Sequence, residues 1–170
     1  RELGPELDTF ASMPPVGIAE LHMDPPDPMP YTSDHALLGP LDRAAIDAAA
    51  SLVDHESGSP LDMFEIRHTG GAMGRTAPHH GALAALPGSY MWFGGGLVFS
   101  EEQGDAHEAR LAEIQAALRP YRVGAYLNFE EVETDTANFF DDAAYARLRA
   151  IRADVDPNEL FHANHQIPPA

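Results

Sequence analysis

The chain has 170 residues, with 27 acidic side chains against 10 basic ones and a formal net charge of −17. Nucleic-acid binding relies on Lys and Arg side chains that neutralise phosphates, so this charge argues against nucleic acid and against an anionic membrane surface as partners. No apolar run approaches the roughly 20 residues that a membrane span requires. The absence of cysteine excludes disulfides and thiolate metal sites, and we expect a cytoplasmic protein.

The first 35 residues are rich in proline, which disfavours long helices. A short helix could run from Pro15 to His22, with proline in its first turn. Residues 31–35 could form a first strand, a solvated loop or a linker. Asp42 is expected to cap a helix that continues to Val53, with an inward face formed by Ile46, Ala49, Leu52 and Val53.

Two strands are expected in the middle of the chain. Residues 62–68 alternate, so Phe64, Ile66 and His68 share one face and Met63, Glu65 and Arg67 the other. Residues 89–100 are the most strand-like, with Tyr90 and Trp92 on a common face. The glycine run 94–96 interrupts this second strand, and it needs either a bulge or bend, or room for a ligand.

The second half begins with a helix predicted from Asp105 to Arg119, where Asp105 and Glu108 resemble a capping box. A strand is predicted over residues 123–130, with Tyr126, Asn128 and Glu130 on one face. A last helix is expected after an N-cap at Asp142, with an apolar stripe formed by Ala144, Leu148, Ile151 and Val155.

This order of elements is too irregular for repeated strand–helix–strand units. It predicts an α+β fold in which helices cover one face of an antiparallel sheet. A chain of this length buries one good core, so residues 1–170 are expected to form a single domain.

Four short motifs in the last fifty residues occur in an order that resembles a known family. They are Tyr126-x-Asn128, Tyr145-x-x-Leu148-x-x-Ile151, Asp156-Pro157-x-x-Leu160-Phe161 and Asn164-x-x-Ile167-Pro168-Pro169. Together, residues 121–170 look like the C-terminal segment of berberine-bridge-enzyme-like oxidoreductases, which are flavoproteins of the vanillyl-alcohol-oxidase type. Residues 65–72 also resemble a strand that ends in a Gly-Gly pair in the substrate domain of that family.

The resemblance implies the substrate domain of an enzyme that oxidises an alcohol- or amine-type carbon by hydride transfer to FAD, commonly with dioxygen as the final acceptor. Such enzymes also need an N-terminal FAD-binding domain, which is expected to precede Arg1 and to bind most of the cofactor. The isolated chain is therefore expected to be inactive, and its uncovered strand faces could let it form a homodimer.

Individual roles follow from the same resemblance. Tyr126 occupies the position of the catalytic base, although a free phenol with a pKa of about 10 must be activated for that role. Cofactor contacts are implied for Asn128, Asn164 and Gln166, and substrate contacts for Trp92 and His68, with hydrophobic-core burial as the other interpretation of Trp92.

The chain departs from the family pattern at two places. Glu131 stands where the family often has Asp, and Asp141-Asp142 stands where Tyr-Gly or Phe-Gly is common, which leaves the shape of the loop beside the flavin open. A free-standing ligand-binding or assembly module of the same fold is the main alternative function. A metal site at the adjacent His79 and His80 is not expected, because neighbouring side chains rarely converge on one ion.

Overall fold

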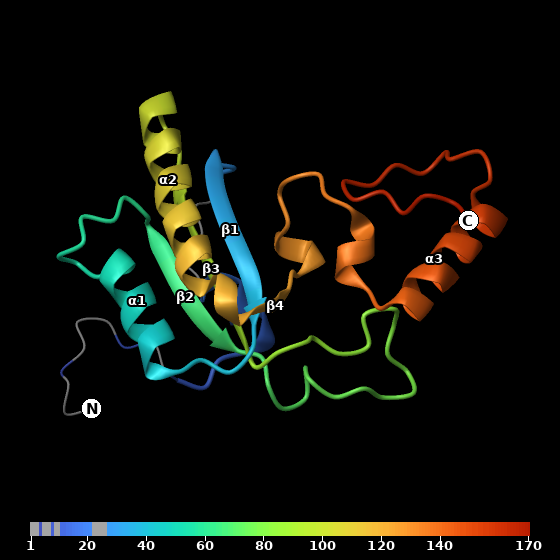
Figure 1. Ribbon diagram of the computed structural model, residues 1–170, viewed down its shortest axis with the longest axis horizontal. Helices are drawn as coiled ribbons and strands as arrows, with labels where there is room; N and C mark the ends of the chain where they lie inside the picture. Colours follow the sequence, from blue (N-terminus) through green and yellow to red (C-terminus); the bar gives the residue numbers. More distant parts are fainter. Residues whose placement is uncertain (1–3, 5–7, 9–10, 22–26) are drawn as a thin grey trace.

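The computed structural model describes residues 4, 8, 11–21 and 27–170. These residues form a four-stranded antiparallel sheet with the strand order β2-β3-β1-β4, and two helices pack on one of its faces (Figure 1). The strands are β1 Tyr31–Leu38, β2 Met63–His68, β3 Tyr90–Leu97 and β4 Arg122–Gly124, and the helices are α1 Arg43–Val53 and α2 Glu101–Leu118. The predicted α+β class is confirmed.

Near the N-terminus, a short 3-10 helix spans Pro15–Glu20, where we expected a short helix. The predicted end of that helix at His22 lies outside the described residues, as do the prolines at positions 5, 25 and 26. The strand predicted at residues 31–35 is present and extends to Leu38, so the loop and linker alternatives are wrong.

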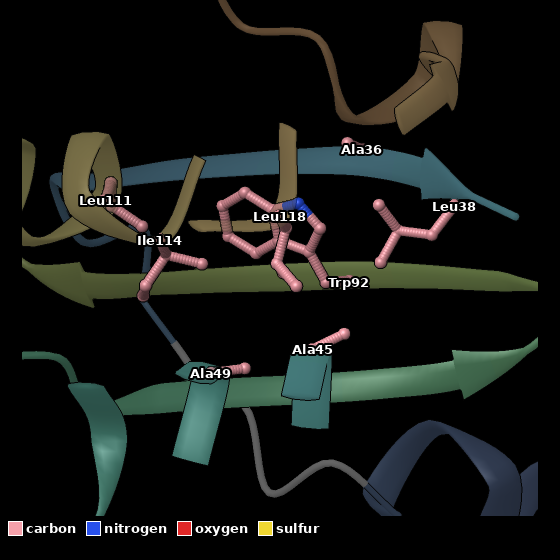
Figure 2. Close-up of a cluster of buried hydrophobic side chains, with 8 residues drawn as sticks. All are labelled: Ala36, Leu38, Ala45, Ala49, Trp92, Leu111, Ile114 and Leu118. Carbon is pink, nitrogen blue, oxygen red and sulfur yellow. The ribbon is translucent and has the colours of Figure 1, made fainter. Parts of the chain in front are cut away.

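The main core lies between the sheet and the two helices. It brings together small and large apolar side chains from β1, β3, α1 and α2 (Figure 2), namely Ala36, Leu38, Ala45, Ala49, Trp92, Leu111, Ile114 and Leu118. Trp92 is 0% exposed and stacks on Phe64, with 6.1 Å between ring centroids. Burying an aromatic side chain of this size removes roughly 150–250 Å² from water, which makes Trp92 the largest apolar contribution to this core.

Strand β3 is central, and its pairing with β1 continues without a register shift through Gly94, Gly95 and Gly96. The bulge that we considered for this run is therefore wrong. A Cβ atom on Gly96 would lie 2.6 Å from the ring of His107, which is fully buried on α2. Glycine is needed at position 96 because α2 packs directly on the strand backbone there.

Helices α1 and α2 each begin at a residue whose side chain caps the first turn. Asp42 accepts a hydrogen bond from the N–H of Ala45 and begins α1 as predicted. The inward face differs from the expectation, because Ala45 and Ala49 are buried whereas Ile46 is 49% exposed. Helix α2 starts four residues before the predicted Asp105, since Ser100 is its N-cap and accepts from the N–H of Gln103.

The predicted strand over residues 123–130 is wrong beyond Gly124. Strand β4 ends there, and the chain turns into a 3-10 helix at Leu127–Phe129. The N–H of Tyr126 donates to Nε2 of His35 at 2.8 Å instead of to a strand carbonyl. The alternation that would have placed Tyr126 and Asn128 on one strand face therefore does not occur.

The rest of the chain forms a tail that lies beside the sheet and carries α3 Asp142–Val155 (Figure 1). Its N-cap is Asp141, one residue before the predicted Asp142. No residue of α3 is buried, and Ile151 and Val155 are 46% and 66% exposed, so the expected stripe is not part of a core in the described structure. The helix lies apart from the sheet (Figure 1), and its neighbours are the loop at residues 80–84 and the C-terminal segment, to which Arg149 and Arg152 donate hydrogen bonds.

Candidate functional site

The second face of the sheet, opposite the helices, is covered at one end only. Leu37 and Met91 are packed under Leu86 and the side chains of Tyr126 and Phe129. Toward the other end the strand surface opens into a pocket of about 740 Å³. Its lining combines strand residues with the segment before β1 and the 3-10 turn: Asp27, Pro28, Met29, Tyr31, Ser33, Asp62, Met63, Arg67, Phe93, Gly95, Gly96, Leu97 and Phe129.

The floor of the pocket is strand backbone at Gly95. A Cβ atom there would lie 2.7 Å from the carbonyl oxygen of Thr32 and 2.9 Å from Cβ of Ser33, so β1 and β3 could not keep this approach with any larger residue. Glycine thus leaves the centre of the floor without a side chain. Of the two explanations considered for the glycine run, the pocket geometry supports room for a ligand.

One wall is built from aromatic rings. The rings of Phe93 and Phe129 lie 5.0 Å apart, and the Arg67 guanidinium carbon sits 5.2 Å from the Phe129 ring centroid. Arg67 also forms an ion pair with Glu65, its neighbour on the same face of β2. The contact with the ring and the pairing with a carboxylate hold the guanidinium in place and compensate its charge.

The opposite edge carries two hydroxyls and a carboxylate. The Ser33 hydroxyl donates to Oε1 of Glu131, which follows the 3-10 turn in sequence. The negative charge of Glu131, followed by burial and a hydrogen bond to the same carboxylate, raises the pKa of the Tyr31 phenol. The raised pKa favours the protonated phenol, so Tyr31 is a hydrogen-bond donor and Glu131 is the acceptor in this cluster.

His35 connects this face of the sheet to the tail. Its side chain is 2% exposed, Nε2 accepts the Tyr126 N–H, and its ring lies edge-on to Phe129 with 6.0 Å between centroids. Burial, reinforced by the charge of Arg122, lowers the pKa of His35 to about 4. The imidazole is thus neutral near pH 7, with Nε2 free to accept the hydrogen bond.

Tyr126, the predicted base, lies next to the pocket wall rather than in the described lining. Its ring packs against the cluster of Leu37, Leu86 and Met91 and meets Phe129 edge-on at 5.4 Å between centroids. Asn128 is exposed in the turn. The structure therefore brings Tyr126 close to the pocket through Phe129 but does not pair it with Asn128.

The other predicted site residues lie elsewhere. Trp92 is in the hydrophobic core beneath the helices, which supports the core interpretation of this residue, and its fully buried ring is not part of the described lining of this pocket. His68 alternates onto the same face as Trp92 and contacts Tyr90 edge-on at 5.4 Å.

The tail amides do not reach the described lining of the pocket either. Asn164 is exposed, and Gln166 accepts from the N–H of Ala163, so its amide closes a turn of the tail. His165 contacts the carbonyl oxygen of Glu130 through Nε2, which attaches the tail end to the segment that carries the pocket wall.

The sequence reasoning missed most of the pocket. The alternation of residues 62–68 did separate Glu65 and Arg67 from Phe64 and His68, and a search for polar residues on that second face would have found them. Nothing local connects Ser33 with Glu131, since 98 positions separate them in the chain. In the part of the chain that the structure describes, no group of three or more His, Cys, Asp or Glu side chains could hold a metal ion, and no helix is long and apolar enough to cross a bilayer.

Two sequence comparisons find relatives of this chain, and one of them locates its match in the tail. Residues 125–168 match the family described as "Berberine and berberine like". A protein of Bacillus subtilis (strain 168), the "Uncharacterized FAD-linked oxidoreductase YvdP", is 30% identical over 73 residues, which is 42% of this chain and 16% of that protein. These matches confirm the resemblance read from the tail motifs.

Solved structures share the fold across most of the chain. BBE-like 1 of Physcomitrella patens has a TM-score of 0.71 at 15% identity over 93% of this chain, and a chitooligosaccharide oxidase has 0.66 at 17% over 84%. Berberine bridge enzyme from Eschscholzia californica has 0.65 at 17% over 91%. The matches cover 34%, 33% and 36% of those three chains, so this chain spans about a third of each.

Proposed function

We propose that this chain, whose residues 125–168 match the family described as "Berberine and berberine like", forms the substrate-binding part of an FAD-dependent oxidoreductase that acts on an alcohol- or amine-type carbon. The observation that carries the proposal is the pocket of about 740 Å³ on the sheet face opposite the helices, which has aromatic walls, a glycine floor and a hydroxyl–carboxylate cluster at its edge. Largely apolar concave sites with a few convergent polar groups are typical of small-molecule binding.

The pocket residues fit one part of FAD. The glycine floor and the rings of Phe93 and Phe129 suit a flat aromatic ring. The diphosphate is not matched by the described lining, because its one basic residue, Arg67, is paired with Glu65. This division supports the proposal that another domain holds most of the cofactor and that this chain contacts the ring and the substrate.

FAD, when bound, supplies the acceptor for the hydride that leaves the substrate carbon. The chain's own part is to orient the substrate and to take up a proton. Phe129 and Arg67 fix the wall, and the Glu131 carboxylate, oriented by Ser33, is an acceptor for the proton that leaves a substrate hydroxyl or ammonium. The family resemblance proposes Tyr126 as the base. Glu131 is the second candidate, because its carboxylate is hydrogen-bonded to Ser33 in the pocket lining.

The proposal is tested by mixing the flavin-loaded full-length protein with candidate alcohols and amines without oxygen and following the flavin absorbance. We expect at least one substrate to bleach the flavin in a single turnover. A protein that binds small molecules tightly yet takes up no FAD and reduces none would instead support the free-standing binding module.

A further inference from the structure

We propose that His35 is a positioning residue of the pocket: its imidazole accepts the Tyr126 N–H and thereby keeps Phe129 in the pocket wall. The segment concerned is residues 126–131, called the wall turn below. His35 is not in the described lining and acts through Phe129, which is. The inference deepens the proposed function, and it rests on that function in taking this pocket as the ligand site.

Hydrogen bonds attach the wall turn to β1 at both of its ends. At its start, the Tyr126 N–H donates to Nε2 of His35. At its end, the Glu131 carboxylate accepts the Ser33 hydroxyl. Ser33 and His35 are two positions apart on one strand, so both side chains point to the pocket face. The Phe129 N–H donates to the Tyr126 carbonyl, so a shift at the start of the turn is passed on to Phe129.

Phe129 connects His35 to the ligand space. Its ring meets the His35 imidazole edge-on, with 6.0 Å between centroids, and lies 5.0 Å from the Phe93 ring. The guanidinium carbon of Arg67 sits 5.2 Å from the same Phe129 ring. Phe93 and Arg67 both line the pocket. A displaced Phe129 would separate from these two neighbours and leave one side of the pocket open.

The imidazole can accept this hydrogen bond in one protonation state only. A neutral ring with its proton on Nδ1 offers Nε2 as an acceptor, whereas a protonated ring carries an N–H on both nitrogens. Burial, followed by the charge of Arg122, lowers the pKa of His35 to about 4, which keeps the ring neutral near pH 7. The closed wall turn therefore depends on a histidine that has not taken up a proton.

Charged groups approach His35 from three segments of the described structure. Arg122 on β4 opposes a proton on the ring, and Glu131 of the wall turn favours one. On β1 itself, the Asp34 carboxylate accepts the backbone N–H of His35, and from α2 the neutral Gln115 amide donates to the His35 carbonyl. Opening the turn would return the ring to water, where its pKa is about 6.5. Between about pH 6.5 and 4, the open state binds a proton that the closed state does not, so acid favours opening.

Amide hydrogen exchange in the full-length protein, resolved to single residues by mass spectrometry, tests this dependence. His35→Gln keeps an acceptor near the place of Nε2, and His35→Met has nearly the same size without an acceptor. We expect the protection factor of the Tyr126 N–H to fall at least tenfold in His35→Met relative to His35→Gln, on the order of one lost hydrogen bond. Equal protection in the two variants would overturn the inference, because side-chain size and not the acceptor would then hold the turn.

The pH profile of the same amide is a second readout. In the wild type, the Tyr126 protection factor should fall by about tenfold or more between pH 7 and 5, whereas in His35→Gln it should stay nearly constant. His79→Gln, at an exposed position, is the matched control and should follow the wild type. The reference amide is that of Ile114, a fully buried residue of α2. If Tyr126 exchanges as slowly as Ile114 and in parallel with it, the turn opens only with the whole domain and the inference is wrong.

Ligand binding shows whether the wall turn shapes the pocket. The probe is 2-acetylnaphthalene, a flat apolar molecule without a titratable group, so its affinity reports changes in the protein alone. Calorimetry with the full-length protein should give an affinity at least fivefold lower, on the order of one hydrogen bond, for His35→Met than for His35→Gln. No binding to the wild type, or equal binding to the two variants, would overturn the inference.

These measurements are separate from flavin chemistry. If the Tyr126 amide and the probe respond as expected but the protein takes up no FAD and reduces none, the proposed oxidoreductase function fails and the positioning role stands. If alcohols or amines reduce the flavin with the same rate and the same KM in His35→Met and His35→Gln, the function stands and this inference fails.

Discussion

The backbone N–H of Tyr126 donates to Nε2 of His35 across 2.8 Å, and the imidazole that accepts it is 2% exposed. Through this bond the centre of the sheet holds the start of the tail, which carries Phe129 into the pocket wall and Glu131 to its edge. The position of the pocket thus depends on a neutral histidine 91 residues away in the sequence from the residue it binds.

The lowered pKa of His35 predicts a loss of stability in acid. Burial and the charge of Arg122 lower this pKa from 6.5 to about 4, while Glu131 acts in the opposite direction. Between these two values the unfolded chain binds the extra proton and the folded chain does not. The free energy of unfolding is therefore unaffected by His35 protonation above pH 6.5. It decreases as the pH falls toward 4, by at most about 3 kcal/mol.

Urea unfolding at several pH values between 7.5 and 4.5 measures this effect, with His35→Gln as the comparison, because an amide can accept the Tyr126 N–H without titrating. The wild type should lose more stability than His35→Gln over that window. His79→Gln, at an exposed position, is the control and should follow the wild type. Parallel pH curves for wild type and His35→Gln would contradict the prediction.

The burial of Trp92 predicts a structural role for that ring. Trp92→Ala should reduce the free energy of unfolding by about 3–5 kcal/mol, because it leaves a cavity between β3 and the helices. Trp92→Phe should cost clearly less, since a ring is retained against Phe64. Circular dichroism during denaturation measures both. If Trp92→Ala keeps the wild-type free energy of unfolding and only binds ligand more weakly, Trp92 would be a substrate contact.

The contact between Gly96 and His107 predicts a coupled pair. Gly96→Ala should destabilise the fold by about 1–3 kcal/mol, because the new methyl group would lie 2.6 Å from the imidazole. Adding His107→Ala removes that clash, so the cost of the double variant should be less than the sum of the two single costs. Gly81→Ala is the control, since nothing lies within 4 Å of the position its Cβ would take. If the losses in unfolding free energy of the two single variants add exactly in the double variant, α2 can move to accept the methyl group and the prediction fails.

The two candidate proton acceptors of the proposed reaction can be separated in the flavin-loaded full-length protein. Glu131 adjoins the pocket through Ser33, whereas Tyr126 packs against the second apolar cluster. We expect Glu131→Gln to slow single-turnover flavin reduction by more than about tenfold and Tyr126→Phe to slow it less. Stopped-flow rates measured across pH decide between them. The reverse order would return the role of base to Tyr126, as the Tyr-x-Asn motif implies.

Local sequence patterns were enough to predict the elements that show a clear side-chain periodicity or a clear helix cap. The alternation of residues 62–68 gave β2, and Asp42 correctly began α1. The same reasoning misplaced the start of α2, because Ser100 and Gln103 cap the helix one turn before the pair at Asp105 and Glu108. The tail motifs were specific enough to indicate the family, since four of them occur in order within fifty residues.

The sequence by itself thus determined the α+β class, most of the helices and strands, and the relationship of the tail. Only the tertiary structure decided where β4 ends and what forms the pocket. A strand pattern such as residues 123–130 continues only while its backbone groups find a neighbouring strand, and here the imidazole of His35 takes the Tyr126 N–H. Likewise, Ser33 and Glu131 meet because β1 and the tail lie together in space, a relationship that side-chain alternation along one segment cannot encode.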